Sequence, residues 1–347
     1  MAKILGIGMI GVGEIADLHA DGYRRCEDAK ILGVTDVDAE LAEMKAKKFG
    51  AAKAYESVDK LLADPAIEAV DIAVPTIFHA ELAVKACEAG KHVMLEKPMA
   101  RTVQECDLIV NSARKAGVKL MINHSLKFFP PFRQCKKLVD DGGIGKMIRM
   151  RATHMGYKYM GWRADPEITG GGLVIEGMVH PTYLTEWFLG PIKKVSAVMG
   201  KTDAEVAAED IALISLESSQ GSFGVIDGNL GGPFPLWDDH LELVGKEGMI
   251  IANGAEQQII RGPPIWYFND GKWTAYREKT FGDEFPFEVP NEVEWAWPKC
   301  FTYSVKEFVS SVIEDRKPEV TGEDGRRAIQ IVRAFYESAK TGRVQEV

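Results

Sequence analysis

The 347-residue chain lacks any apolar run approaching the ~18 residues that suggest a membrane span. Basic residues are also in deficit, with 42 Lys and Arg against 51 Asp and Glu, which gives a net charge of −9. This balance argues against a nucleic-acid or anionic-membrane partner. An apolar strand is expected from the third residue onward, which leaves no room for a signal peptide, so we expect a cytoplasmic location.

Cysteine is scarce. The five cysteines are odd in number and lack the paired spacing of a metal site, so we expect free thiols in a reducing compartment and no bound metal. No short-period repeat or low-complexity segment is present. What remains is a chain that is 46% hydrophobic and 27% charged, which is typical of a globular protein of about two domains.

The first third of the chain alternates strand and helix patterns. Strands are predicted at 3–10, 30–35, 69–74, 91–95 and 118–122, and helices at 39–49, 57–64, 79–89 and 102–116. Asp38 and the pair Thr102 and Glu105 are the expected helix caps, and Gly50 and Gly117 the expected helix ends. This alternation predicts a doubly wound parallel sheet with right-handed crossovers.

A glycine-rich turn follows the first strand, and two registers of it compete. Gly6, Gly8 and Gly11 spell one fingerprint but leave a strand of barely three residues, whereas Gly11, Gly13 and Ala16 leave a full-length strand. We therefore expect the second register, which places dinucleotide phosphates at a helix N-terminus. Asp36 ends the next strand. A carboxylate there accepts hydrogen bonds from ribose hydroxyls and repels a 2′-phosphate, which favours NAD over NADP.

After about residue 124 strand patterns dominate, at 146–154, 194–199, 210–217, 222–230, 240–245, 248–252 and 257–261. Asp270-Gly271 predicts a hairpin, and long helices return at 301–315 and 324–340. The expected fold class is α/β: an N-terminal Rossmann domain with a doubly wound parallel sheet over 1–124, then an α+β domain with a large, mostly antiparallel sheet over 125–347, which binds substrate and mediates oligomerisation.

Two chemical features stand out. Glu96-Lys97-Pro98 follows the strand at 91–95, at the sheet edge where α/β folds bind ligands. A single helix is expected over 173–189, in which Glu176 and His180 stand four residues apart on one face, beside Gly170-Gly171-Gly172. Such a histidine can accept a hydroxyl proton, and a lysine can stabilise the resulting alkoxide.

The order of these motifs resembles the Gfo/Idh/MocA family of NAD(P)-dependent oxidoreductases, named after glucose–fructose oxidoreductase and inositol dehydrogenase. The matching segments are Gly11-Val12-Gly13-Glu14-Ile15-Ala16 with His19, Asp36, Val74-Pro75-Thr76 with His79, Gly90-Lys91-His92-Val93, Glu96-Lys97-Pro98, Trp162-Arg163, Gly170-Gly171-Gly172, Glu176 with His180, and Gly245-Lys246-Glu247-Gly248. The resemblance implies catalytic roles for Lys97, His180 and Glu176, with Glu176 orienting His180 and holding substrate hydroxyls.

The resemblance also implies two binding sets. Cofactor contacts are expected from Gly11, Gly13, Glu14, Ile15, Asp36, Val74, Pro75, Thr76, His79, Glu96, Lys97 and Asn123. Substrate contacts are expected from Lys97, Lys127, His154, Tyr157, Trp162, Arg163, Glu176, His180 and Tyr183. The chain departs from the family pattern at Glu176 and Thr76, where the family more often has aspartate and asparagine, at Tyr183, where it often has aspartate, and at Lys127, where it usually has arginine.

The expected function is NAD-dependent oxidation of a secondary hydroxyl of a sugar, polyol or sugar derivative to a ketone, or the reverse reduction. The alternatives are a reductase of a non-sugar carbonyl or diol and a non-catalytic NAD-binding sensor. Either Lys97 or His180 can be the proton acceptor. We expect a small-molecule substrate and a homodimer or homotetramer formed through the open face of the second sheet.

Overall fold

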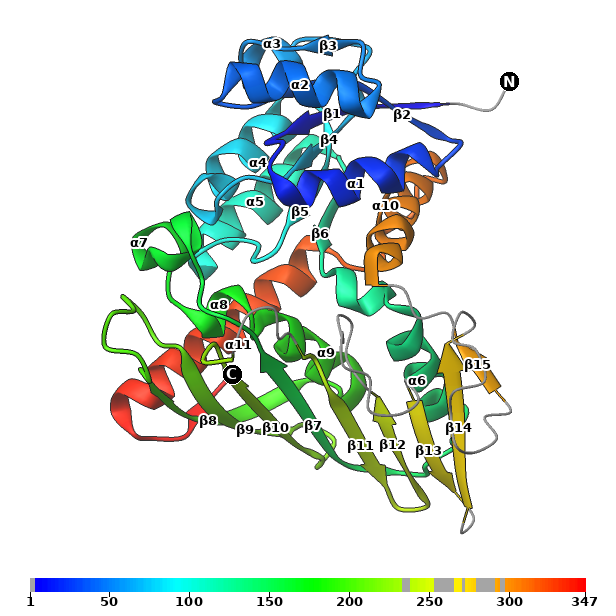
Figure 1. Ribbon diagram of the computed structural model, residues 1–347, viewed down its shortest axis with the longest axis vertical. Helices are drawn as coiled ribbons and strands as arrows, with labels where there is room; N and C mark the ends of the chain where they lie inside the picture. The colour runs from blue at the N-terminus through cyan, green and yellow to red at the C-terminus, as the bar shows by residue number, and fades with distance from the viewer. Residues whose placement is uncertain (1–3, 233–237, 253–264, 270–271, 279–290, 294–296) are drawn as a thin grey trace. The chain divides into compact units, whose positions relative to one another are not determined.

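The computed structural model describes residues 4–232, 238–252, 265–269, 272–278, 291–293 and 297–347. The chain forms two compact units, each with its own sheet (Figure 1). The first unit contains Met1–Ser125 and Pro298–Ile329, and the second contains Leu126–Trp297 and Gln330–Val347. The segment 298–329, which was expected in the second domain, packs with the first unit.

The first unit is built on a six-stranded parallel sheet in the order β3-β2-β1-β4-β5-β6. Its strands are β1 (Leu5–Ile10), β2 (Ala29–Thr35), β3 (Lys53–Ala54), β4 (Ala69–Ile72), β5 (His92–Glu96) and β6 (Leu120–Asn123). The strand order reverses between β1 and β4. The carboxyl ends of the strands at such a reversal form the crevice in which this fold binds ligands.

Helices cover both faces of this sheet. They are α1 (Glu14–Arg24), α2 (Ala39–Phe49), α3 (Val58–Leu62), α4 (His79–Glu88) and α5 (Val103–Ala116), with a 3₁₀ turn η1 (Thr76–Phe78) before α4. Right-handed crossovers place α1 and α2 on one face and α4 and α5 on the other. The expected caps are confirmed: Asp38 accepts from the Leu41 backbone N–H, and Thr102 and Glu105 form a capping box.

The first unit is completed by α10 (Trp297–Ile313) and the start of α11 (Gly322–Thr341). α10 packs on α1, and the centroids of the Phe301 and His19 rings are 5.5 Å apart. Gly22 of α1 allows this approach: a Cβ added there would lie 3.0 Å from Val305 Cγ2. A helix from the far end of the chain thus supports the glycine-turn helix.

The second unit contains a ten-stranded sheet in the order β15-β14-β13-β12-β11-β7-β10-β9-β8-β16. Its strands are β7 (Met147–Met155), β8 (Ile192–Gly200), β9 (Ile211–Ser218), β10 (Phe223–Asn229), β11 (Leu241–Gly245), β12 (Gly248–Ala252), β13 (Ile265–Asn269), β14 (Lys272–Glu278), β15 (Asn291–Val293) and β16 (Gln345–Glu346). Pairing is antiparallel except for β7 with β10 and β14 with β15.

Short helices connect and cover this sheet: η2 (Ser125–Phe128), α6 (Pro130–Asp140), η3 (Gly161–Ala164), α7 (Pro166–Thr169), α8 (Leu173–Glu176) and α9 (Val179–Leu189). α6, α8 and α9 pack on one face of the sheet (Figure 1). The inward residues Met150, Ala152 and Ile226 are fully buried. The opposite face exposes Val198, Leu213 and Phe223 by 70%, 56% and 56%.

The predicted fold class is confirmed, with differences at particular elements. The strand expected over 69–74 ends at Ile72, and the helix expected from 301 begins at Trp297. The hairpin is confirmed by the pairing of β13 with β14, although Asp270-Gly271 and the strand expected at 257–261 lie outside the described residues. The single helix expected over 173–189 is wrong, because α8 and α9 are separate helices. No described helix is long and apolar enough to cross a membrane.

Candidate functional site

The glycine turn of the first unit adopts the second register. Gly6 and Gly8 lie within β1, where a Cβ on Gly6 would approach Ala66 O to 2.1 Å. Gly11 has φ +84°, and a Cβ there would lie 2.5 Å from Ala73 O, so the turn accepts only glycine. Gly13 is the N-cap of α1, and the space beside its Cα is open. The backbone N–H groups of α1 thus begin beside an uncrowded turn, which fits a pyrophosphate.

Asp36 lies against this turn. Its Oδ2 accepts a hydrogen bond from the Val12 N–H at 2.8 Å, and its Oδ1 accepts from the Asp38 N–H at 3.1 Å. Asp38 is the cap of α2, as predicted. A partly exposed carboxylate fixed beside a phosphate-binding turn fits the adenosine ribose of NAD, so these residues are suited to hold the cofactor's adenosine half.

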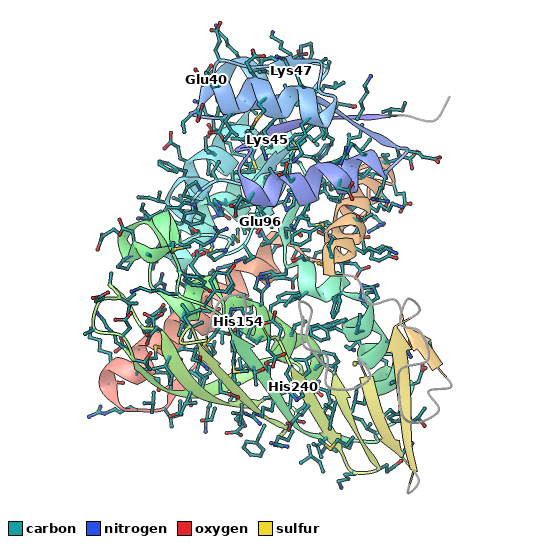
Figure 2. The ribbon with its side chains drawn as sticks, in the orientation of Figure 1. Glu40, Lys45, Lys47, Glu96, His154 and His240 are labelled. Atoms are coloured by element: carbon teal, nitrogen blue, oxygen red, sulfur yellow. The ribbon has the colours of Figure 1, made fainter. Side chains whose placement is uncertain are left out.

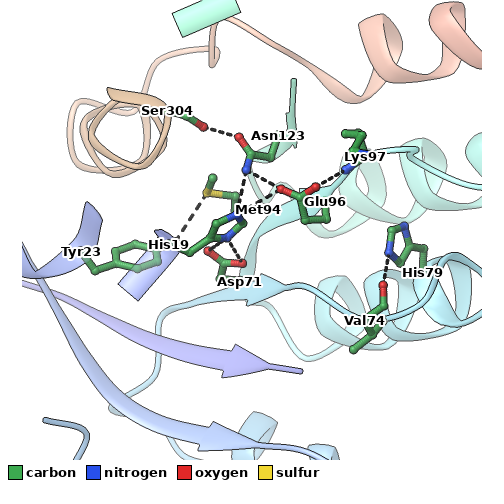
Figure 3. A network of polar contacts seen from close by, with 10 residues as sticks. All are labelled: His19, Tyr23, Asp71, Val74, His79, Met94, Glu96, Lys97, Asn123 and Ser304. Carbon is green, nitrogen blue, oxygen red and sulfur yellow. Dashed lines mark hydrogen bonds and ion pairs between the residues drawn. The ribbon is translucent and has the colours of Figure 1, made fainter. Parts of the chain in front are cut away.

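A buried charged network lies at β4, β5 and β6 (Figure 3). The two ring nitrogens of His19 face two carboxylates: Nδ1 lies 2.9 Å from Asp71 Oδ1, and Nε2 lies 3.1 Å from Glu96 Oε1. Asn123 donates to Glu96 Oε1 at 2.6 Å, and the Ser304 hydroxyl of α10 donates to Asn123 Oδ1. His19 Nε2 also lies 3.0 Å from Asn123 Nδ2. The two carboxylates that face the ring favour its charged form.

The electrostatics of the network follow from this geometry. Burial by itself lowers the pKa of His19, but Asp71 and Glu96 raise it to about 10. Burial likewise opposes the ionisation of Glu96, yet the hydrogen bond from His19 and the nearby charges of His19 and Lys97 hold its pKa below the usual value. The result is a buried assembly that stays ionised at neutral pH.

Lys97 follows β5 directly and is held by this network. Its backbone N–H donates to Glu96 Oε2 at 3.1 Å. On the other side, the His79 ring nitrogens lie 2.9 Å from Pro98 O and 2.9 Å from Val74 O, so His79 ties the loop after β4 to the loop after β5. The Lys97 side chain is partly exposed, which leaves it accessible at the carboxyl edge of the sheet.

Three residues assigned to the cofactor by resemblance, Glu96, His79 and Asn123, are buried in these contacts. Sequence reasoning did not assign Asp71 and Ser304 to the site. For Asp71 a signal existed, since a lone carboxylate in the apolar strand β4 must find a buried partner. Ser304 gave none, because its partner Asn123 lies 181 residues away in the chain.

In the second unit, Glu176 and His180 lie on either side of the break between α8 and α9. The Leu173 carbonyl accepts from both the Gly177 N–H at 2.8 Å and the Met178 N–H at 2.9 Å, so one extra residue enters the helical turn. One extra residue in a turn rotates the following side chains about the helix axis by about 100°. Glu176 and His180 therefore do not share one helix face as residues four apart in a regular helix would. Glu176 ends α8 and is almost fully buried, while His180 is partly exposed near the start of α9.

The predicted substrate residues fall into separate groups. Arg163 Nε lies 3.9 Å from Glu176 Oε2, and its guanidinium stacks 4.5 Å above the Trp162 ring. The Lys127 ammonium lies 5.8 Å from the centroid of the Tyr183 ring. Tyr157 is partly exposed. His154, by contrast, is fully buried on β7 (Figure 2), with Nδ1 2.7 Å from Asp239 Oδ1.

A cavity of about 420 Å³ in the second unit borders the Arg163 group. Its walls include Tyr159, Arg163, Gly172 and Glu209. Glu209 Oε1 accepts from the Gly172 and Val174 N–H groups and from the Tyr336 hydroxyl, so it braces the start of α8. Among the described residues, no group of three or more His, Cys, Asp and Glu side chains is arranged to hold a metal ion.

Comparison with known proteins bears on this arrangement. The family model described as an oxidoreductase family with an NAD-binding Rossmann fold matches residues 5–124, and the GFO/IDH/MocA C-terminal domain model matches residues 132–251. A myo-inositol 2-dehydrogenase of Thermotoga maritima is 26% identical over 347 residues, covering 97% of each chain. A 1,5-anhydro-D-fructose reductase of Ensifer adhaerens is 27% identical over 358 residues, covering 98% of each chain.

The fold is shared with solved structures. A levoglucosan dehydrogenase in complex with NADH and levoglucosan superposes with a TM-score of 0.89 at 21% identity, covering 99% of each chain. The glycine turn, Asp36 and the two matched domains all agree with the resemblance stated from the motifs, and with NAD as the cofactor. The chain belongs to the Gfo/Idh/MocA family of NAD-binding oxidoreductases.

Proposed function

We propose that the protein is an NAD-dependent dehydrogenase that oxidises a secondary hydroxyl of a sugar, a polyol or a sugar derivative to a ketone. The observation that carries this proposal is the way in which the backbone around Lys97 is held at the carboxyl edge of the sheet. The Lys97 N–H donates to the Glu96 carboxylate, and the carbonyl of the next residue, Pro98, is hydrogen-bonded to His79. A non-catalytic NAD sensor has no need to fix a cation at this position.

The proposed roles divide between the two units. Bound NAD supplies the acceptor for the hydride that leaves the carbinol carbon. His180 accepts the hydroxyl proton, because a partly exposed imidazole is a suitable base near neutral pH. Lys97 stabilises the developing alkoxide by charge and hydrogen bonding. Glu176 holds substrate hydroxyls and orients His180, with Arg163 near its carboxylate.

NAD is proposed as the preferred cofactor over NADP. The Asp36 carboxylate accepts a hydrogen bond from the Val12 N–H, which fixes it beside the turn. A 2′-phosphate on the adenosine ribose would be repelled by this carboxylate. One relative is named a dehydrogenase and another a reductase, so the same groups are compatible with either direction of the reaction. Reduction of a carbonyl with the same groups, in which His180 donates the proton, is therefore the second candidate.

The first experiment incubates the purified chain with NAD and a panel of inositols, aldoses and anhydrosugars while NADH absorbance is followed. A second arm supplies NADH with the corresponding ketones. Turnover in either arm that is lost in Lys97→Met and His180→Asn supports the proposal. Tight NAD binding without turnover on any alcohol or carbonyl would favour the sensor instead.

We also propose that the chain forms a homodimer or homotetramer through the open face of the second sheet. Val198, Leu213 and Phe223 are exposed apolar side chains on this face. Charged residues lie beside them, since Leu213 pairs with Asp227 and Phe223 with Glu217, and Asp227 forms an ion pair with Arg151. Large exposed apolar side chains of this kind support the proposal that another chain covers this face. Light scattering should give a multiple of 38.3 kDa, and Leu213→Glu with Phe223→Glu should reduce it to one chain.

A further inference from the structure

The break between α8 and α9 rests directly on the buried His154 ring. A Cβ added to Gly177 would lie 2.3 Å from His154 Nε2, 2.6 Å from His154 Cδ2 and 2.6 Å from the Tyr159 hydroxyl oxygen. Real Cβ atoms essentially never come so close to another atom. Gly177 is therefore the point at which the backbone between Glu176 and His180 packs on β7.

His154 is itself fixed from behind by Asp239. Its Nδ1 lies 2.7 Å from Asp239 Oδ1, and both side chains are buried. Because an ionised carboxylate only accepts, Nδ1 is the donor and the orientation of the ring is set. The Asp239 segment is tied to the end of β7 in turn, since Met155 and Asp238 exchange backbone hydrogen bonds of 2.8 and 2.9 Å.

This burial gives His154 a structural interpretation as well. Its ring has no exposed surface, and the substrate contact that the resemblance implies stays a prediction. Its Nε2 side faces the break. The break carries the two residues to which the proposed function assigns a carboxylate and a base. A histidine whose Nδ1 is held by a carboxylate presents its other ring nitrogen in a fixed direction, so backbone that packs on that side of the ring meets a fixed surface.

We propose that His154 and Asp239 are positioning residues, which hold the α8–α9 break at Gly177 and thereby orient Glu176 and His180. The inference rests on the proposed function for its consequence in catalysis. Its structural content, that the pair sets the surroundings of His180, holds without any substrate. A pair that only joined β7 to the Asp239 segment would affect stability and leave His180 unchanged.

The first test needs no substrate. The chain is labelled with ¹⁵N-histidine, and long-range ¹H–¹⁵N NMR spectra are recorded at one pH for the unmodified protein, Asp239→Asn and the surface control Asp140→Asn. His154 should show a proton on Nδ1, and Asp239→Asn should change its signals and those of His180 together. Unchanged His180 signals in Asp239→Asn would overturn the proposal. The control should alter neither residue.

The second test is a compensating pair of substitutions, which also guards against a variant that fails to fold. Asparagine at position 154 can still donate to Asp239 but leaves space beneath the break, and alanine at position 177 adds a methyl group there. Gly177→Ala alone and His154→Asn alone should each shift the His180 signals. The double variant should restore them towards the unmodified spectrum, and a double variant no closer than either single one would refute the packing argument.

Kinetics then connect the pair to catalysis once a substrate is known. A small misplacement of a catalytic group costs on the order of 10²-fold in rate. His154→Asn should lower kcat by about that factor with the KM for NAD unchanged, and His154→Asn with Gly177→Ala should recover part of it. Gly200→Ala is the matched glycine control, since its added Cβ would lie 3.6 Å from the nearest atom. If no substrate is turned over, the proposed function fails while the NMR result still decides the positioning role.

Discussion

The two units hold their proposed chemical groups by different physical means. In the first unit, Lys97 stands at the end of a strand, and a buried ionised network centred on His19 fixes its backbone. In the second unit, His180 stands after a helix break that packs on the buried ring of His154. Because Lys97 directly follows a strand, the register of the sheet already fixes its position, and the charged network only has to hold the loop that begins there. The position of His180 depends instead on close packing at one glycine, Gly177.

The comparison predicts that the two units respond differently to perturbation. Removing one charge from the network leaves another charge buried without compensation, which is a large cost in free energy. Removing the ring beneath Gly177 leaves a small cavity, and its main consequence is orientation. Substitutions in the His19 network should therefore reduce stability, whereas substitutions beneath Gly177 should mainly reduce function.

The largest expected effect is on turnover. Lys97→Met and His180→Asn should each reduce kcat by about 10²–10⁴-fold, because general acid–base and electrostatic groups contribute on that scale. NAD affinity, measured by fluorescence titration, should change little in His180→Asn. The pH profile of oxidation then assigns the base, since the limb that reports it should vanish in only one of the two variants. Near-normal turnover in both would place the chemistry elsewhere.

The second prediction concerns the stability of the first unit. Asp71→Asn should lower the free energy of unfolding by about 3–5 kcal/mol, because it leaves the His19 imidazolium with one of its two carboxylates lost. Asp21→Asn, which breaks an exposed ion pair with Arg25, should cost less than about 1 kcal/mol. Urea unfolding measures both. A cost for Asp71→Asn no greater than that of the control would show that the network is not ionised.

The third prediction is the pH dependence of that stability. His19 has a pKa of about 10 when folded against an ordinary value of 6.5, so the folded state binds the extra proton. Its stabilising contribution is therefore complete below pH 6.5 and is lost as pH rises towards 10. Glu96 has a lowered pKa, so its contribution is lost as pH falls below its ordinary value. In His19→Gln the thermal unfolding midpoint should fall less steeply with rising pH over the alkaline range than in the unmodified protein. An equally steep fall in the midpoint of that variant would contradict the assignment.

Much of the first unit is predictable from local sequence because its signals are local. Gly11, Gly13 and the caps Asp38 and Thr102 each act through neighbours within a few residues, and the structure places them as expected. Contacts over long sequence separation were not predictable. The packing of Pro298–Ile329 with the first unit and the hydrogen bond from Ser304 to Asn123 join distant segments that carry no shared pattern.

The second unit shows where periodicity misleads. The apolar pattern over 173–189 continues smoothly through Gly177, and a lone glycine within such a pattern is normally tolerated in a helix. The structure shows close tertiary packing at this break, since the His154 ring occupies the space in which a side chain of residue 177 would lie. The alternation along β7 correctly placed His154 on the same face as Met150 and Ala152, but alternation cannot distinguish a buried residue from one that lines a binding site.

The smallest expected effect separates cofactor preference from cofactor binding in the first unit. Asp36→Ser removes the charge beside Val12 but keeps a hydroxyl, so the preference for NAD over NADP should fall by about tenfold, equivalent to about 1.4 kcal/mol. The change should come mainly from tighter NADP binding, because the repulsion of the 2′-phosphate is relieved. Asp38→Ser is the matched control: it retains a helix cap and should leave the ratio unchanged. Dissociation constants for both cofactors, measured by calorimetry, decide the matter, and equal use of NAD and NADP by the unmodified chain would show that Asp36 does not select the cofactor.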